Sequence, residues 1–519
     1  MPSSLSDVLQ SGYGFPGPAL TLGAALDRGT VLPEPKIRIP LAMMNRHGLV
    51  AGATGTGKTR TIQLLTEQLS AAGVPVFVAD IKGDLSGLAM PGEVSDRVTQ
   101  RATDIRWTWT PAGVPVEFVS LTGKLGVQLR ATVASFGPLL LAKVLGLNDT
   151  QTSVLTLVFK YCDDQRLPLL DLSDLRAALQ FLTSAEGKAE LDALGGMSPA
   201  SVGVLLRKMV ELEMQGAEQF FGEPEFDVLD LLHCSREGRG VVTCLELSDV
   251  QDKPQLYSTF LMWLLAELYH TLPEAGDLDK PKLVFFFDEA HLLFNDASKA
   301  FLQQVEQVVR LVRSKGVGVY FVTQTPRDVP SDILAQLGHR VQHALRAHTP
   351  DDEAALRSAV RTYPRTEFYD LEVTLTSLGI GEAVVTALDP RGVPTPVVAA
   401  RLIPPASRMA PLTSDELQAD IRQSDLLAEY GTAVNRESAR EMLTARLGAG
   451  RASPPANEAS SPPATTKQPG MSTGAKIGTA IFAALGTTVA RSVGRALVRG
   501  VLGGLLGGKA SRGTRRTRW

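Results

Sequence analysis

The stretch "HGLVAGATGTGKTRT", residues 47–61, carries the most specific pattern in the chain. Residues 52–59 match G-x-x-x-x-G-K-[ST] at every fixed position. The short apolar run "GLVAG" leads into this loop, and "TRTIQLLTEQL" follows it with apolar residues at helical spacing. A strand, a glycine-rich loop and a helix in this order predict a phosphate cradle, because the helix N-terminus also faces the anion.

Each fixed residue of the loop has a physical reason. Three glycines let the backbone bend so that successive N–H groups point at phosphate oxygens. Lys58 is expected to reach the β- and γ-phosphates of ATP, and the Thr59 hydroxyl is expected to ligate Mg²⁺. The predicted nucleotide-binding residues are Gly52, Ala53, Thr54, Gly55, Thr56, Gly57, Lys58, Thr59 and Arg60.

Composition limits the class of protein. A length of 519 residues favours two or three compact units, and 44% hydrophobic with 21% charged residues is typical of a soluble globular protein. The three cysteines, Cys162, Cys234 and Cys244, are too far apart to suggest a disulfide framework or a zinc site. The first residues show no basic segment followed by an apolar core, so we expect no secretory signal and a cytoplasmic protein.

Apolar runs that resemble buried parallel strands recur along the chain, with helical segments between them. They lie at 74–80, 114–121, 240–247, 282–290 and 317–324. This alternation predicts an α/β fold with a RecA-like P-loop core and a mostly parallel sheet. In residues 130–238 the apolar residues recur at helical spacing instead, and this segment is expected to form a helical insert in that core.

The remaining segments complete the expected organisation. After residue 448 the chain is rich in Pro, Ser and Ala, which predicts a disordered linker. The predicted units are a short β-rich segment at 1–46, the first part of the ATPase core at 47–129, the insert at 130–238, the second part of the core at 239–403, a helix and linker at 404–470, and a basic, Gly-rich amphipathic tail at 471–519.

The run "LVFFFDEAHLLF" supplies the second half of the predicted site. An apolar strand that ends in Asp288 places a carboxylate at a strand tip, where it can hold Mg²⁺ opposite Thr59. Glu289 is then placed to orient and deprotonate a water that attacks the γ-phosphate. The adjacent acids favour hydrolysis over transfer to a bulky acceptor, although acids also occur at helix N-termini for electrostatic reasons alone.

Further polar residues are candidates for the catalytic machinery. Gln324 ends the strand-like run "FVTQ" and could contact the γ-phosphate or the water, or simply cap a loop. Arg310 and Arg313 lie on the polar side of a predicted helix, and Arg340 follows in "LGHRVQHALRA". One of them, with Arg313 preferred, is expected to reach the nucleotide of a neighbouring subunit in a ring. The alternative is an ordinary solvated helix face.

Several separate stretches together resemble one family. They are "NRHGLVAGATGTGKT", "VADIKGDLSGLA", "LGLNDTQTSVLTLVFKYCDD", "FFFDEAHLLF", "QQVEQVVRLVRSKGVGVYFVTQTPRDVP", "LGHRVQHALRA" and "GIGEAVVTALDPRGVPTPV". This set is similar to the HerA-like helicase-domain proteins of the YjgR type, in the HerA/FtsK branch of P-loop ATPases. The resemblance implies ATP hydrolysis with Mg²⁺, a hexameric ring and translocation on DNA.

Three classes of function follow from the residues and the resemblance. They are a ring motor on DNA, a secretion-type ATPase motor that acts on protein, and a nucleotide-dependent transferase or switch that does not translocate. Only about 46 residues precede the loop, fewer than the N-terminal barrel of archaeal HerA needs. The predicted core also lacks an obvious Lys/Arg cluster for a DNA channel.

The C-terminal tail differs in charge from the rest of the chain. Residues 471–519 hold nine of the 52 Lys and Arg residues and none of the 55 Asp and Glu residues, which leaves the rest at −12. Arg491, Arg495 and Arg499 form a basic stripe, and the uncharged run 477–490 is too short to span a bilayer. We expect peripheral contact with the inner face of an anionic membrane or with another acidic partner; self-association, a basic arm on nucleic acid and a weakly structured tail are alternatives.

Overall fold

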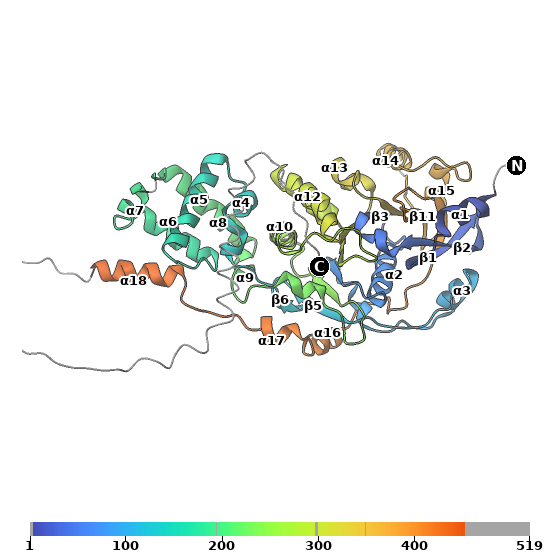
Figure 1. The fold of residues 1–519 in the computed structure, drawn as a ribbon, viewed down its shortest axis with the longest axis horizontal. Coiled ribbons are helices and arrows are strands. Elements are labelled where there is room, and N and C mark those ends of the chain that lie inside the picture. The colour runs from blue at the N-terminus through green and yellow to red at the C-terminus, as the bar shows by residue number, and fades with distance from the viewer. Residues whose placement is uncertain (1–3, 194, 296–298, 348, 452–519) are drawn as a thin grey trace, which may run out of the picture. The chain divides into compact units, whose positions relative to one another are not determined.

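The computed structural model describes residues 4–193, 195–295, 299–347 and 349–451 (Figure 1). In chain order the strands of this part are β1 (Ala19–Asp27), β2 (Thr30–Pro40), β3 (Gly48–Ala51), β4 (Val76–Asp80), β5 (Val116–Ser120), β6 (Val127–Gln128), β7 (Val242–Glu246), β8 (Leu283–Phe287), β9 (Val317–Thr323), β10 (His339–Gln342), β11 (Glu382–Thr386) and β12 (Val398–Leu402). They form one 12-stranded sheet in the order β2-β1-β12-β11-β10-β3-β9-β8-β4-β7-β5-β6.

The sheet has a parallel part and an antiparallel part. From β10 to β6 every neighbouring pair runs parallel, whereas β11, β12, β1 and β2 extend the sheet with antiparallel pairs. The predicted α/β class with a mostly parallel sheet is confirmed. Each of the five apolar runs contains one of the parallel strands β4, β5, β7, β8 and β9.

Parallel strands are apolar along their whole length because both faces of the sheet are covered. In β8, Leu283, Phe285 and Phe287 belong to one apolar cluster, and Val284 and Phe286 belong to the cluster on the other face. All five are buried. The alternation fixes the register of the strand and sets the residue that follows it, Asp288, at the carboxyl edge of the sheet.

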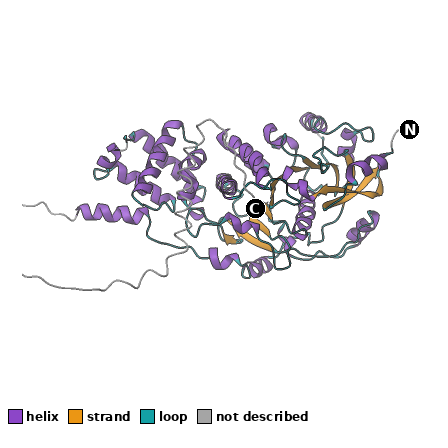
Figure 2. Ribbon diagram, viewed as in Figure 1, coloured by secondary structure: helices purple, strands orange, loops and turns teal. Residues whose placement is uncertain are grey.

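Helices surround this sheet, and a group of them lies at one end of it (Figures 1 and 2). The described α-helices are α1 (Leu5–Tyr13), α2 (Lys58–Ala71), α3 (Asp96–Asp104), α4 (Val133–Val144), α5 (Asp149–Asp164), α6 (Leu172–Thr183), α7 (Lys188–Ala193), α8 (Pro199–Met214), α9 (Ala217–Phe220), α10 (Pro254–Thr271), α11 (His291–Phe294), α12 (Lys299–Val312), α13 (Ser331–Leu334), α14 (Pro350–Val360), α15 (Leu371–Ser377), α16 (Ser414–Ile421), α17 (Leu426–Tyr430) and α18 (Ala439–Arg451).

The helices α4–α9 share their apolar core with one face of the sheet. Aromatic rings connect the two: Phe136 lies 6.0 Å from Phe220, Phe220 lies 5.8 Å from Phe260 of α10, and Phe260 lies 6.5 Å from Phe77 of β4. Ring pairs at these separations add to the free energy of burial. The helices between β6 and β7 are therefore packed onto the sheet.

The segment after the sheet differs from the sequence prediction. It holds three helices, α16, α17 and α18, where the sequence suggested one helical stretch. The last of these, α18, continues to Arg451, past residue 448. The remainder of the predicted linker and the whole predicted tail lie outside the described residues. Among the described helices, none combines the length and apolar character that a membrane span requires.

Candidate nucleotide-binding site

The glycine-rich loop joins the end of β3 to the start of α2. Gly52, Gly55 and Gly57 all have positive φ, at 156°, 77° and 117°. A Cβ at Gly52 would lie 2.5 Å from the Cβ of His343, which is buried beside the loop. The loop therefore needs glycine for its backbone conformation and for its close packing.

Lys58 is held over this loop. Its ammonium group donates to the carbonyl oxygens of Gly52, at 2.7 Å, and Ala53, at 3.3 Å. Burial lowers the pKa of Lys58, while the carboxylates of Glu289 and Asp288 act in the opposite direction. A buried cation at the N-terminus of α2 is a suitable partner for the phosphates that the loop motif predicts.

Asp288 and Glu289 follow directly after β8, which lies two positions from β3 in the sheet, with β9 between them. Both side chains are buried, and the Oδ2 atom of Asp288 has no hydrogen-bond partner among the described residues. Since parallel strands end at the same edge of the sheet, the predicted acids and the loop lie at one edge. The structure thus brings Lys58, Thr59, Asp288 and Glu289 to a common site.

Three carboxylates near Thr59 form a group that suits a divalent cation. Carboxylate oxygens of Asp80, Asp84 and Asp288 lie within 4.8 Å of one another, and the Thr59 hydroxyl donates to Asp84 at 3.3 Å. Asp80 also accepts hydrogen bonds from backbone N–H groups of the loop that follows β4. Oxygen ligands of this kind are those that Mg²⁺ prefers, so these residues fit the predicted ion.

The pKa values of these carboxyl groups also fit a site for a divalent cation. Burial, followed by repulsion from Glu289, raises the pKa of Asp288 to about 7. Burial also raises the pKa of Asp80 to about 6, with Asp84 adding to the effect. Clustered carboxylates resist ionisation unless a cation balances them, and a divalent ion between them would provide that balance.

Glu289 has two cationic or polar neighbours that the sequence did not indicate. Its carboxylate forms an ion pair with Lys82 and lies 3.1 Å from Nδ1 of His291. Its φ of 45° is unusual for a residue with a side chain. Such a backbone conformation costs on the order of 1–3 kcal/mol and is found most often at functional sites.

Sequence reasoning missed Asp80, Lys82 and Asp84. The available signal was their position, since Asp80 is the last residue of β4 and Lys82 and Asp84 follow it in "ADIKGD". Strand β4 lies beside β8 in the sheet, so the polar residues after both strands meet at one edge. A search for polar residues after every predicted parallel strand would have found them.

The other predicted residues lie in different places. Gln324 is exposed and follows β9, which lies between β3 and β8 in the sheet. Arg310 and Arg313 lie before the amino end of β9, at the opposite edge, where they line a cavity of about 1000 Å³. Arg340 is in β10, with its guanidinium 5.9 Å from the centre of the Tyr363 ring. The structure does not bring these three arginines to the loop of their own chain.

A parallel sheet with a G-x-x-x-x-G-K-T loop and buried acids two strands away defines a P-loop ATPase. The chain belongs to the family described as Helicase HerA-like C-terminal, whose model matches residues 28–512.

Three proteins with known functions or structures are similar to this chain at low sequence identity. The DNA double-strand break repair helicase HerA of Saccharolobus solfataricus is 19% identical over 351 residues, which cover 67% of this chain and 63% of HerA. The chain thus spans less than two thirds of that relative. Among solved structures, the bacterial conjugative coupling protein TrwBdeltaN70 is 14% identical, with 77% and 98% of the two chains covered and a TM-score of 0.48. VirB4 of Thermoanaerobacter pseudethanolicus is 13% identical, with 78% and 98% covered and a TM-score of 0.47.

Proposed function

We propose that this chain is a subunit of an ATP-driven ring motor of the HerA/FtsK type that acts on DNA. The observation that carries the proposal is the meeting of Lys58, Thr59, Asp288 and Glu289 at one edge of the sheet. Each of the four supplies a different part of phosphoryl chemistry, and the loop between β3 and α2 provides the anion cradle.

The metal-binding part of the site consists of Thr59 and Asp288, with Asp80 and Asp84 beside them. When bound there, Mg²⁺ would neutralise negative charge on the phosphate oxygens. Lys58 would contact the same oxygens from the loop side. These residues therefore hold the substrate and stabilise charge, and they leave proton transfer to another group.

Glu289 is the residue placed for that proton transfer. It is next to Asp288 and is only 5% exposed at its side chain, so its carboxylate acts in a site from which bulk water is largely excluded. Lys82 and His291 contact its two carboxylate oxygens and can fix the orientation of the group. The preferred reaction is hydrolysis, with Glu289 accepting a proton from the attacking water.

The proposal of a ring and the proposal of DNA as the polymer are supported by different observations. Arg310 and Arg313 lie at the edge of the sheet away from Lys58, so they could serve a nucleotide only in another subunit. DNA is proposed because the chain belongs to the HerA-like family and because its relative HerA is described as a DNA repair helicase. In this proposal, identical subunits form a ring around the polymer.

Two substitutions test the chemistry. Glu289→Gln should bind ATP with near wild-type affinity but lose about 10²–10⁴-fold in hydrolysis, because a general base contributes that much. Lys58→Ala should weaken nucleotide binding itself. Binding is measured by calorimetry and hydrolysis by phosphate release. A Glu289→Gln protein that hydrolyses ATP at the wild-type rate would exclude this residue as the base.

A further inference from the structure

His343 is a buried histidine that lies directly behind the phosphate-binding loop and has no part in the chemistry proposed above. It follows β10, the strand beside β3. Its backbone N–H group donates to the carbonyl oxygen of Ala51 at 2.7 Å, and the carbonyl oxygen of Ala344 accepts from the N–H group of Ala53 at 2.9 Å. The chain at 343–344 is therefore bonded to the end of β3 and to the start of the loop.

The two ring nitrogens of His343 have different partners. Nδ1 lies 2.9 Å from the carbonyl oxygen of Glu382, the first residue of β11, and Nε2 lies 2.8 Å from the hydroxyl oxygen of Thr61 in the first turn of α2. Burial lowers the pKa of His343 to about 4, so the ring is neutral at ordinary pH. Because a carbonyl oxygen can only accept, Nδ1 carries the proton and donates, and Nε2 accepts from the Thr61 hydroxyl.

The Thr61 hydroxyl has two acceptors within reach, and the histidine is the nearer one. The hydroxyl oxygen lies 3.3 Å from the carbonyl oxygen of Gly57, which also accepts from the N–H group of Thr61 at 3.1 Å. Thr61 is only 1% exposed, so bulk water cannot replace the bond to His343. The ring therefore fixes the first turn of α2, the end of the helix that faces the phosphates.

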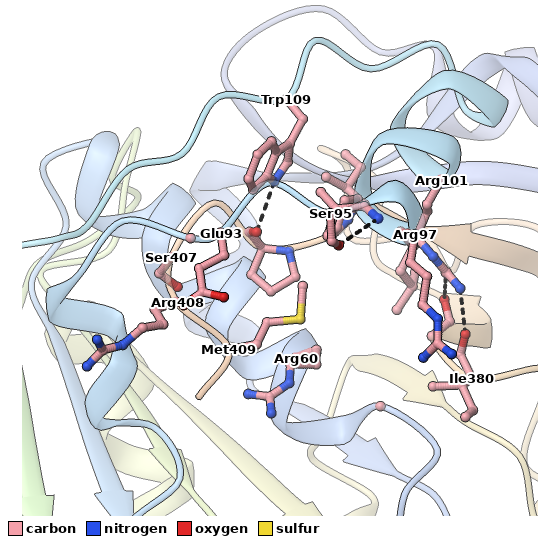
Figure 3. Close-up of a pocket in the computed structure, with 18 of the residues that line it drawn as sticks. Arg60, Glu93, Ser95, Arg97, Arg101, Trp109, Ile380, Ser407, Arg408 and Met409 are labelled. Atoms are coloured by element: carbon pink, nitrogen blue, oxygen red, sulfur yellow. Dashed lines mark hydrogen bonds between the residues drawn. The ribbon is translucent and has the colours of Figure 1, made fainter. Parts of the chain in front are cut away.

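The segment 379–382, to which Nδ1 is bonded, is itself held in place. Arg101 of α3 donates to the carbonyl oxygens of Ile380, at 2.7 Å, and Gly381, at 3.0 Å (Figure 3). The N–H group of Gly381 in turn donates to the carbonyl oxygen of Thr56 at 2.9 Å. The loop and the histidine ring are therefore attached to the same support.

The loop also packs closely against this support. A Cβ at Gly57 would lie 3.1 Å from the backbone nitrogen of Gly381 and 3.4 Å from Cε1 of His343. Interiors packed at this density transmit small displacements from one group to the next. A change in the orientation of the ring would therefore move the loop.

We propose that His343 is a positioning residue that joins the first turn of α2 to the segment 379–382 and so holds the loop in its phosphate-binding conformation. This inference rests on the proposed function of the loop. Without the bond to Thr61 the loop would populate other conformations, and the apparent affinity for nucleotide would fall in proportion to the fraction that stays competent. Once nucleotide is bound, the loop has its wild-type conformation, so the rate of hydrolysis is maintained.

Three substitutions in the full chain test the hydrogen bond. His343→Asn keeps a donor near the position of Nδ1 but has no acceptor for Thr61, and Thr61→Val removes the hydroxyl. Each should weaken the binding of ADP with Mg²⁺, measured by calorimetry, about tenfold. The value of kcat at saturating ATP should stay within about twofold of wild type, so that KM rises alone. His343→Gln places an amide oxygen near the position of Nε2 and should restore near wild-type affinity.

A double variant and a matched control make the test specific. His343→Asn and Thr61→Val remove the same hydrogen bond, so the double variant should bind ADP about as well as either single variant. His339→Gln is the control, because His339 is a buried histidine at the other end of β10, with Nε2 2.8 Å from the carbonyl oxygen of Met43. It should lower the thermal midpoint without changing the affinity for ADP.

The possible results distinguish this inference from the proposed function. Unchanged ADP affinity in Thr61→Val would overturn the positioning role, and so would losses that multiply in the double variant. An equal loss in His339→Gln would overturn it as well, because the effect would then be general destabilisation. If His343→Asn does not fold, Thr61→Val and His343→Gln still decide between these results. Wild-type protein that binds no ADP would instead overturn the function proposed for the loop.

Discussion

At the scale of single residues, Lys82 forms an ion pair with Glu289, the proposed base. The ammonium group is the cationic partner of a buried carboxylate whose backbone already has an unusual φ of 45°. An uncompensated buried carboxylate would change its orientation or its protonation. We infer that Lys82 positions Glu289 and is not itself the base.

Substitution of Lys82 tests this positioning role. Lys82→Met keeps much of the side-chain length but removes the charge, so kcat should fall about 10²-fold, as expected when a reacting group is misplaced by about 1 Å. Nucleotide affinity, measured separately by calorimetry, should stay close to wild type. Lys82→Arg restores a cation and should recover part of the rate. A Lys82→Met protein with unchanged kcat would contradict the role.

Sequence alone identified the residues whose roles depend on local spacing. Lys58, Thr59, Asp288 and Glu289 lie in short motifs, and the structure brings them together. Asp80, Lys82 and Asp84 were missed because their position depends on the pairing of β4 with β8, which are about 200 residues apart. The pairing itself leaves no short pattern in the sequence, and the position of the three residues at the end of an apolar run was the signal that the sequence offered.

At the scale of elements, the segment 403–410, which follows β12, is joined to α2 through the buried acid Glu67. Glu67 is 9% exposed, and burial raises its pKa to about 7 even though two backbone N–H groups act in the opposite direction. A carboxyl group whose pKa is higher in the folded than in the unfolded state stabilises the fold at low pH. Its contribution is complete below pH 4.5 and is lost as the pH rises through 7.

This linkage gives a pH prediction. As the pH rises from 5 to 8, the contribution of Glu67 to the free energy of unfolding should decrease by on the order of 3 kcal/mol. Glu67→Gln cannot titrate, so its thermal midpoint, followed by circular dichroism, should fall less over this range than that of wild type. Glu416→Gln is the control, because the pKa of Glu416 is lowered to about 2, chiefly by Arg408. Parallel pH profiles for wild type and Glu67→Gln would contradict the prediction.

The elements that sequence predicted are those buried on both faces. Long apolar runs marked β4, β5, β7, β8 and β9. The antiparallel strands were not located individually, because they mix polar, charged or proline residues with apolar ones. β2, for example, contains Pro33 and Pro35, which disfavour an interior strand. The parallel strand β10 is only four residues long, "HRVQ", and three of the four are polar or charged.

At the scale of the whole molecule, the proposed ring requires an arginine that reaches the nucleotide of a neighbouring subunit. Arg310 and Arg313 lie before β9 begins, whereas Lys58 follows the end of β3, and these two strands are parallel neighbours. The length of a strand therefore separates the arginines from the loop of their own chain. A ring would give each loop access to a second chain, which a single subunit cannot provide.

The proposal of an ATP-driven ring motor on DNA is tested most directly by two measurements. They are ATP turnover with and without duplex DNA, and the mass of the protein in solution with ATP bound. A ring motor on DNA should be an oligomer whose turnover rises when DNA is added and whose DNA affinity falls steeply with salt, because contacts with phosphates release counterions. Glu289→Gln should form the same oligomer without turnover. A monomer that hydrolyses ATP at a rate independent of DNA would contradict the proposal of a ring motor on DNA.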